Sequence, residues 1–326
     1  MKVFITGATG FIGGAVARRL RARGDEVIAL ARSPRRAAEL EKIGCRIVNG
    51  DLNQGILIED SMTGCDGVVH GAAVYDVGIP KKARPAMWDA NVKGTETVLG
   101  AALRKKVKKV VYISTINAFG NTHGQVVDET HQHDEKFVSY YDETKFRAHQ
   151  VARRLIEQGL PAVIVQPGGV YGPGDPSVLG TVMHQFLAGR LPALMYPESG
   201  FNLVHVDDLA DGIVLALDKG RPGEAYVLGG ELTTLGDAIA TLARVAGKKA
   251  PRLTVPGAAL KVIAPLGPLV GPLMGFGPNL REMITAADGV TYWATDAKAR
   301  EELGYTARPL EQGLRDTLQA EGRLPA

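Results

Sequence analysis

Short apolar runs alternate with amphipathic stretches along most of the chain. Seven runs are expected to form strands, at 3–5, 26–31, 46–48, 67–70, 109–114, 162–166 and 225–228. Helical periodicity occupies the stretches around 14–23, 34–43, 84–105, 140–158 and 207–219. Strands that alternate with helices in this way predict a parallel sheet covered on both faces. The expected fold class is therefore α/β, with a doubly wound parallel sheet.

The periodicity loosens after residue 172, where Pro and Gly become frequent, and the parallel pattern returns briefly near 203–230. We therefore expect a core of residues 1–172 and 203–231, and a smaller substrate-binding lobe of residues 173–202 and 232–326. The segment 262–280 carries no charge but contains four prolines and four glycines. These residues disfavour a continuous membrane-spanning helix, so a capping or pocket-lining element is expected instead.

Composition indicates an ordinary globular enzyme. A net charge of +3, from 38 basic and 35 acidic residues, is too balanced to indicate a nucleic-acid partner. Cys45 and Cys65 lack metal-ligand spacing, and two cysteines make a disulfide framework unexpected, so we expect a reducing cytoplasm and no metal site. The first strand begins at residue 2, so no signal peptide is expected. Asp207 and Asp208 are expected to cap a helix that begins at Leu209.

Three glycines follow the first apolar run at a spacing of three residues: Gly7, Gly10 and Gly13. A strand, a glycine turn and a helix in this order place a pyrophosphate on the amides of the helix N-terminus. Gly7 permits the tight turn, Gly10 lets the backbone approach the phosphates, and Gly13 lets helix and strand pack closely. The turn is therefore expected to bind a dinucleotide, together with its remaining contact residues Thr9, Phe11 and Ile12.

The end of the second strand indicates which dinucleotide is bound. A site specific for NAD usually carries Asp or Glu here for the ribose hydroxyls, whereas this chain carries Arg32. An arginine can hold a 2′-phosphate, and Arg35 and Arg36 follow closely. We therefore expect NADP(H) to be preferred over NAD(H), with Arg32 and Arg36 as contacts.

Acid–base chemistry is expected at Tyr141 and Lys145, which lie on one face of a helix at i and i+4. A tyrosine with its usual pKa of about 10 is a poor acid–base group at neutral pH. The Lys145 cation is expected to lower the pKa of Tyr141 towards the working range. Thr115, at the end of an earlier strand, is expected to hold the substrate oxygen opposite the phenol.

These motifs together resemble the extended short-chain dehydrogenase/reductase family, also described as the NAD(P)-dependent epimerase/dehydratase family. The resemblance covers essentially the whole chain and implies a Rossmann-type fold. It implies that Thr115, five residues before Gly120, is catalytic with Tyr141 and Lys145. The motifs include the glycine turn, His70–Ala73, Asn91–Thr95, Pro167–Pro173, His205–Leu209 and Lys298–Tyr305. The implied cofactor contacts outside the turn are Asp51, Leu52, Ala72, Asn91, Ser114, Tyr141, Lys145, Pro167 and Val170.

Departures from the family pattern narrow the expected reaction. Sugar-nucleotide dehydratases follow the catalytic Thr with Asp-Glu, where this chain has Ile116 and Asn117. Many sugar-nucleotide epimerases carry an arginine for the nucleotide phosphates where this chain has Phe201, and Gln166 replaces another arginine common in sugar-modifying members. Losing such a cation removes a contact worth about 1.5–3 kcal/mol. Substrate contacts are therefore expected from Thr115, Asn117, Gln166 and Phe201.

The resulting expectation is an NADPH-dependent reductase of a ketone or aldehyde, resembling the dihydroflavonol 4-reductases, with an apolar or aromatic substrate. A nucleotide-sugar (UDP-sugar) 4-epimerase is the alternative, and a non-catalytic dinucleotide-binding sensor is the second alternative. By resemblance, the helices near 84–105 and 140–158 imply a homodimer.

Overall fold

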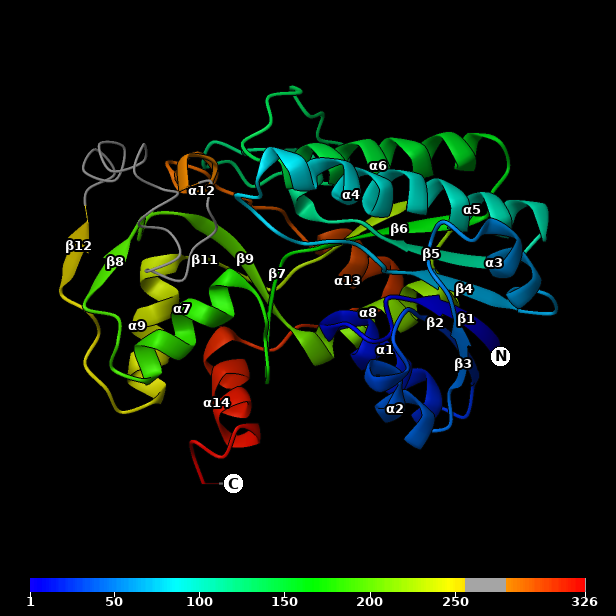
Figure 1. The fold of residues 1–326 in the computed structure, drawn as a ribbon. Coiled ribbons are helices and arrows are strands. Elements are labelled where there is room, and N and C mark those ends of the chain that lie inside the picture. Colours follow the sequence, from blue (N-terminus) through cyan, green and yellow to red (C-terminus); the bar gives the residue numbers. More distant parts are fainter. Residues whose placement is uncertain (256–279, 326) are drawn as a thin grey trace.

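A seven-stranded parallel sheet forms the centre of the computed structural model, which describes residues 1–255 and 280–325. Its strand order is β10-β6-β5-β4-β1-β2-β3 (Figure 1). The strands are β1 (Lys2–Thr6), β2 (Glu26–Ala31), β3 (Arg46–Asn49), β4 (Gly67–His70), β5 (Lys109–Ile113), β6 (Ala162–Pro167) and β10 (Ala225–Leu228). All seven predicted strands and the α/β class are confirmed. Strand β5 ends at Ile113, so Ser114 lies just beyond it.

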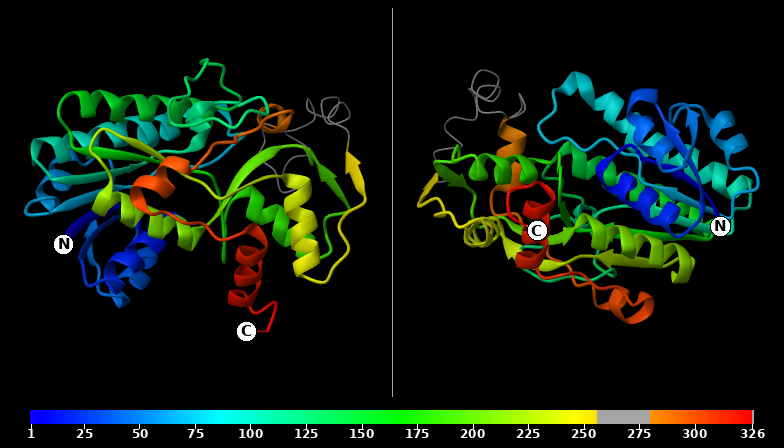
Figure 2. Two further views of the ribbon diagram at one scale, coloured as in Figure 1. Left: turned by 180° about the vertical axis from the view of Figure 1, so that it is seen from behind. Right: turned by 90° about the horizontal axis from the view of Figure 1, so that it is seen from below.

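Helices cover both faces of the sheet, as Figure 1 and the rotated views in Figure 2 show. One face carries α1 (Phe11–Ala22), α2 (Pro34–Lys42), α8 (Val206–Lys219) and α13 (Ala297–Leu303). The other carries α3 (Gly55–Ser61), α4 (Arg84–Trp88), α5 (Gly94–Arg104) and α6 (Tyr140–Glu157). Alternate residues of each strand enter two apolar clusters: Val163 packs with α1 and α8, and Ile164 packs with α5 and α6. Burial on both faces explains why the strands read as continuous apolar runs.

The stretch around 84–105 is helical as predicted, but it is not one regular α-helix. A short 3-10 helix η1 (Lys81–Ala83) precedes α4, and a π-helical turn η2 (Asp89–Lys93) separates α4 from α5. π-turns inside α-helices are frequently found at functional sites. Here the turn buries Asn91, whose amide bonds the backbone of Val74.

The second part of the structure is built on two small sheets. One contains β7 (Gly169–Tyr171), β9 (Gly200–His205) and β11 (Glu231–Thr234), and the other contains β8 (Ala193–Met195) and β12 (Leu253–Val255). Helices α7 (Val178–Leu187), α9 (Leu235–Val245) and α14 (Leu310–Ala320) share an apolar cluster that includes Phe186, Leu242 and Leu314. Helix α12 (Leu280–Ala287) lies near β8 and β12 (Figure 1). The uncharged segment 262–280 lies, apart from its last residue, outside the described residues.

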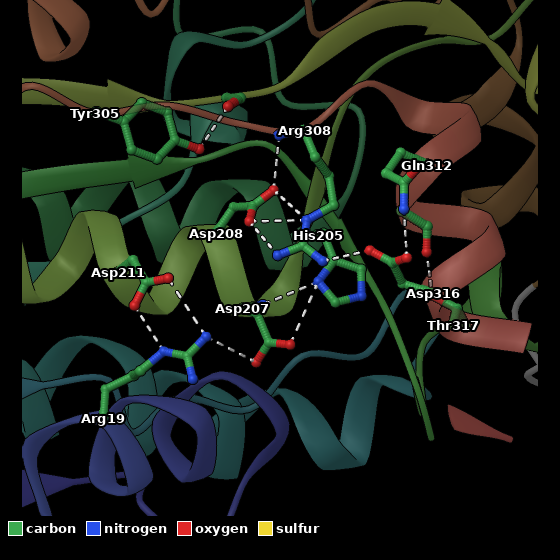
Figure 3. Close-up of polar contacts among 12 residues, drawn as sticks. Arg19, His205, Asp207, Asp208, Asp211, Tyr305, Arg308, Gln312, Asp316 and Thr317 are labelled. Carbon is green, nitrogen blue, oxygen red and sulfur yellow. Dashed lines mark hydrogen bonds and ion pairs between the residues drawn. The ribbon is translucent and has the colours of Figure 1, made fainter. Parts of the chain in front are cut away.

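Arg308 ties the two parts together at the start of α8 (Figure 3). Its guanidinium contacts Asp208 at 2.6 Å and Asp316 of α14 at 2.7 Å. The expected cap is wrong by three residues, because α8 begins at Val206 with His205 at its N-cap, and Asp208 lies in the first turn. No helix in the described part of the chain has the length and apolar character needed to cross a membrane.

Candidate active site

The glycine turn connects β1 to α1 at the point where the strand order reverses. Gly7 has a φ of +81°, and a Cβ on it would lie 2.7 Å from the backbone nitrogen of Ala72 after β4. A Cβ on Gly13 would lie only 2.2 Å from the Gly7 carbonyl oxygen. Glycine is therefore required in this turn for two reasons. A side chain at Gly7 or Gly13 would clash with nearby backbone atoms, and Gly7 has a positive φ. Ligands of doubly wound sheets bind at such a switch point.

Helix α1 is open to an anion at its first turn. Gly10 is its N-cap and offers no side-chain cap, and this turn contains no acidic residue. Thr9 is exposed, while Phe11 and Ile12 are partly buried against the core. The amides and the dipole of this helix end therefore suit a pyrophosphate, so the cradle fits a dinucleotide.

A buried histidine fixes the strand edge next to this turn. Thr95 donates its hydroxyl to the Asn91 carbonyl at 2.7 Å, so its oxygen accepts from His70 Nε2 at 3.0 Å. His70 Nδ1 then accepts from the Thr6 hydroxyl at 2.7 Å, and the Ala72 amide donates to that same hydroxyl at 3.3 Å. Burial lowers the pKa of His70 to about 3, which keeps the ring neutral in this chain of bonds.

Two residues that were predicted to contact the cofactor, Asn91 and Ser114, have side chains that form hydrogen bonds with other residues of the protein. The Asn91 amide donates to the Val74 carbonyl at 3.0 Å and to the Thr144 hydroxyl at 2.9 Å, and accepts from the Val74 amide at 2.7 Å. The Ser114 hydroxyl lies 3.0 Å from His149 Nδ1. Asn91 and Ser114 thus hold the loop after β4 and helix α6 in place.

Arg32 lies at the surface, where the ends of β2 and β3 meet. Its side chain is 71% exposed, and its Nε lies 3.9 Å from the carboxylate of Asp51. Arg36 is also exposed, in the first turn of α2, a turn without acidic residues. Leu52 packs under α5, since a Cβ on Gly94 would lie 2.7 Å from its side chain. The structure thus brings Arg32 and Asp51 together, with Arg36 in the first turn of the helix that follows β2.

Tyr141 and Lys145 are buried in the first turns of α6, which Ser139 caps by accepting from the Asp142 amide. Lys145 Nζ donates to the Ile113 carbonyl at 3.1 Å, at the end of β5, and burial lowers the pKa of Lys145 to about 8. The ring of Tyr75 contacts Tyr141 edge-on at 4.8 Å. Tyr141 and Lys145, the pair predicted from the sequence, therefore lie against the end of β5, just before Ser114 and Thr115.

The predicted lowering of the tyrosine pKa is wrong for this structure. Burial raises the pKa of Tyr141 well above its usual value, and the neighbouring Tyr75 and Asp142 act in the same direction. A buried phenol in such surroundings keeps its proton at neutral pH, because ionisation would place an unsolvated charge beside acidic groups. Burial thus outweighs the effect on Tyr141 that was expected from Lys145.

Thr115 and Asn117 join a hydrogen-bonded chain that the sequence reasoning missed. The Thr115 hydroxyl donates to Asn117 Oδ1 at 3.0 Å, and Asn117 Nδ2 donates to Asp142 Oδ1 at 2.9 Å. The Tyr292 hydroxyl donates to the other oxygen of Asp142 at 3.0 Å. Burial raises the pKa of Asp142 to about 6. An acidic residue directly after Tyr141 was the available signal in the sequence, but its partner Tyr292, 150 positions away, could not be predicted.

Gln166 lies near the end of β6 in the large sheet, and Phe201 lies near the start of β9 in a small sheet. Gln166 is 1% exposed, and its two amide atoms have no hydrogen-bond partner among the described residues. Phe201 packs on the apolar cluster of the smaller part, and its ring lies 3.8 Å from where a Cβ on Gly169 would stand. It therefore lies beside Pro167–Val170, the segment that the resemblance places along the nicotinamide.

The fold and this site define an NAD(P)-dependent oxidoreductase of the extended short-chain dehydrogenase/reductase type. Comparison with known proteins gives the family: residues 3–229 match the model described as "NAD dependent epimerase/dehydratase family". The chain belongs to this family, and it is an enzyme of the reductase and epimerase group.

Two curated relatives and one solved structure illustrate the relationship. The Synechocystis sp. protein named "Putative dihydroflavonol 4-reductase" is 35% identical, over 97% of this chain and 93% of its own length. The 4-hydroxy-2-methyl-3-oxo-4-farnesyl-3,4-dihydroquinoline-1-oxide ketoreductase of Stigmatella aurantiaca is 31% identical, over 99% of this chain and 97% of its own. The crystal structure of gox2253 is 34% identical, with a TM-score of 0.83 and 99% of each chain covered.

Proposed function

We propose that the protein is an NADPH-dependent reductase of an apolar or aromatic ketone or aldehyde. The observation that carries this proposal is the buried pair of Tyr141 and Lys145, whose ammonium group donates to the Ile113 carbonyl at 3.1 Å, at the end of β5. Reduction of a carbonyl needs a proton donor at its oxygen, and a positioned phenol can supply that proton. Oxidation of an alcohol would instead require Tyr141 to accept a proton.

The proposed mechanism assigns one task to each residue. When bound, the nicotinamide supplies the hydride for the carbonyl carbon. Tyr141 gives its proton to the carbonyl oxygen, and Lys145, held against the Ile113 carbonyl, orients the nicotinamide ribose. Thr115 holds the substrate oxygen on the side opposite the phenol. The glycine turn binds the pyrophosphate and so fixes the distance between hydride donor and substrate.

The substrate class follows from the polarity of the predicted pocket residues. Phe201 occupies the position at which many epimerases carry a phosphate-binding arginine. The side chain of its neighbour Asn202 already donates to the Ala294 carbonyl at 2.6 Å and accepts from the Gly230 amide at 2.6 Å. A doubly charged nucleotide tail would lose its hydration here without gaining a cation. The name of the Stigmatella relative describes an oxo group on a molecule with a farnesyl chain, which agrees with an apolar ketone.

A turnover assay tests the proposal against its two alternatives. We expect the purified protein to oxidise NADPH in the presence of at least one member of a panel containing acetophenone, 2-tetralone, benzaldehyde and farnesal. Conversion of UDP-glucose into UDP-galactose without net NADPH loss would establish the epimerase alternative. Tight NADPH binding without either reaction would favour the sensor, and both outcomes would reject the reductase.

The cofactor preference is expected to depend on Arg32. We expect Arg32→Asp to weaken NADPH binding by about 10- to 100-fold, the range for losing a charge-assisted contact, and to strengthen NADH binding slightly. The reason is that a carboxylate beside Asp51 repels a 2′-phosphate and accepts from ribose hydroxyls. Dissociation constants for both dinucleotides at low ionic strength measure the effect. Arg190→Asp, at an exposed position of the smaller part, is the control, and equal wild-type affinities for NADH and NADPH would refute the assignment.

We further propose that residues 1–172 and 203–231 hold the dinucleotide, and that residues 173–202 and 232–326 supply the substrate pocket. The shared apolar cluster of α7, α9 and α14 supports the second part, whereas α13 packs on the large sheet with Tyr305 donating to the Gly229 carbonyl at 2.7 Å. A homodimer through α5 and α6 and a cytoplasmic location remain proposals from the family resemblance. Light scattering on the purified protein tests the former.

A further inference from the structure

A buried carboxyl stands one hydrogen bond behind the hydroxyl that is proposed to hold the substrate oxygen. Asp142 is 2% exposed and lies in the first turn of α6. Asn117, in the 3-10 helix η3 (Ile116–Phe119), bridges Asp142 to Thr115, and Tyr292 contacts Asp142 from the other side. No Lys or Arg ammonium or guanidinium pairs with Asp142 among the ion pairs of the described residues.

The ionised form of Asp142 dictates the direction of every bond in this chain. A carboxylate only accepts, so Asn117 must turn its Nδ2 towards it and its Oδ1 towards Thr115. The Thr115 hydroxyl then donates to Asn117, while the Asn117 backbone amide donates to the Thr115 oxygen at 3.2 Å. The hydroxyl proton of Thr115 is thereby directed away from a developing oxyanion.

Protonation of Asp142 permits the opposite direction. A neutral carboxyl can donate to Asn117 Oδ1, so the amide turns and presents Nδ2 to the Thr115 oxygen. The Thr115 proton is then free to donate to the substrate oxygen. Tyr292 keeps donating to the second oxygen of Asp142 in either state, so neither arrangement leaves a buried group unpaired.

We propose that Asp142 is a positioning residue that sets, through Asn117, whether the hydroxyl of Thr115 donates to the substrate oxygen. This inference rests on the proposed reductase function, in which Thr115 faces the carbonyl oxygen. Carbonyl reduction is favoured when Asp142 is protonated, because the developing oxyanion then receives two donors instead of one. Asp142 itself does not touch the substrate.

The tyrosines that face Asp142 keep their protons near neutral pH, so Asp142 is the residue among them that titrates there. Tyr75, Tyr141 and Tyr292 all have pKa values raised by burial, to about 12 for Tyr75 and well above the usual value for the other two. Glu282 of α12 is the other acid that faces the carboxyl, and its charge raises the pKa of Asp142 further. Burial is the largest cause of the value of about 6 for Asp142. Reduction is therefore expected to be fastest below this pH and to slow as pH rises through it.

The decisive variant is Asp142→Asn, because an asparagine imitates the protonated acid. Its Nδ2 can donate to Asn117 Oδ1, and its Oδ1 can accept from Tyr292. With the fastest ketone of the panel, we expect the wild-type kcat to fall by about 30-fold between pH 5 and 7.5. Losing one oxyanion donor costs about 10²- to 10³-fold, but about 3% of a carboxyl with a pKa of about 6 is still protonated at pH 7.5, and this fraction limits the fall. Asp142→Asn should stay near the low-pH value throughout, and so exceed the wild type at pH 7.5. A variant that merely damaged folding could not gain activity in this way.

Two further variants separate this role from a general effect of charge. Tyr292→Phe removes a donor to the carboxylate, so the inflection in kcat should move up by about half a pH unit to one unit. Asp134→Asn, at an exposed loop carboxylate, should leave the profile unchanged. The separate inflection expected from Lys145 near pH 8 should persist in all three variants. If Asp142→Asn kept the wild-type inflection, the inference would be overturned.

A measurement without turnover distinguishes this inference from the proposed function. The side-chain amide signals of Asn117, assigned with Asn117→Ala in nuclear magnetic resonance spectra, should shift between pH 5 and 7.5 in the wild type and not in Asp142→Asn. If no ketone is reduced but these signals titrate, the reductase proposal fails and the hydrogen-bond switch stands. If the signals do not move with pH, the inference fails whatever the enzyme reduces.

Discussion

Replacing Tyr141 by phenylalanine is expected to lower kcat by about 10²- to 10⁴-fold, the usual contribution of a positioned proton donor. Dinucleotide affinity should stay near the wild-type value, because the substitution removes one oxygen and keeps the ring that packs against Tyr75. The fold should also persist, because the hydrogen bond that Tyr141 accepts from the Thr144 hydroxyl at 2.9 Å goes to its backbone carbonyl and is kept in the variant. Stopped-flow measurement of NADPH oxidation and fluorescence titration of NADPH binding provide the two readouts.

Tyr140→Phe is the matched control for this prediction. Tyr140 is the adjacent residue, but its ring lies under the Arg84 guanidinium at 4.7 Å rather than beside Tyr75. Its backbone amide, which the substitution keeps, donates to Glu282 at 2.6 Å. We therefore expect Tyr140→Phe to reduce kcat by less than about threefold, as is usual for a substitution outside the chemistry. A larger loss for Tyr140→Phe than for Tyr141→Phe would show that the catalytic phenol is assigned to the wrong residue.

Adding a single methyl group at Gly13 is expected to abolish useful cofactor binding. The Cβ of Gly13→Ala would stand 2.2 Å from the Gly7 oxygen and 3.0 Å from the Ala8 nitrogen, and both atoms belong to the backbone. The turn must therefore move, and its amides lose their alignment with the pyrophosphate. Losing one or two charge-assisted bonds predicts a fall in NADPH affinity of at least about 100-fold. Calorimetric titration measures the affinity, and circular dichroism verifies the fold.

Gly100→Ala provides a control with the same chemical change in a helix. The nearest atom to its Cβ would be the mobile end of Arg104, at 3.3 Å. Because alanine is a better helix former, this variant should bind NADPH like the wild type and be stabilised by about 0.4–1 kcal/mol. Equal NADPH affinities for Gly13→Ala and Gly100→Ala would contradict the placement of the phosphates at the glycine turn.

The large sheet could be predicted because its strands are buried on both faces. Runs such as Val27–Ala31 and Val110–Ile113 have no polar alternation, and the helices between them have clear periodicity. The π-turn at Asp89–Lys93 could not be predicted in this way, since its cause is a contact between Asn91 and the loop at Val74. The small sheets were also missed, because three-residue strands such as Ala193–Met195 carry too few positions to show a period.

The candidate site could be predicted where chemistry is encoded locally. Gly7 and Gly13 are constrained by neighbours a few residues away, and Tyr141 and Lys145 share one helix face. The pKa shifts of these residues, by contrast, could not be predicted from nearby positions in the sequence. Burial of Tyr141 outweighs the effect expected from Lys145, and burial depends on the whole tertiary structure. The cofactor and substrate contacts themselves remain predictions that the binding experiments above can test.

The position of α8 along the chain has a consequence during synthesis. Six of the seven sheet strands exist once residue 167 has been made, but one face of the sheet is covered by Leu209, Ile213 and other residues of α8, which ends at Lys219. At ribosomal rates, the roughly fifty intervening residues take about 3–10 s. Throughout that interval the nascent chain carries an apolar sheet face that α1 and α2 cover only in part. Chaperone capture and early termination products that aggregate are the expected cellular signatures of this order of assembly.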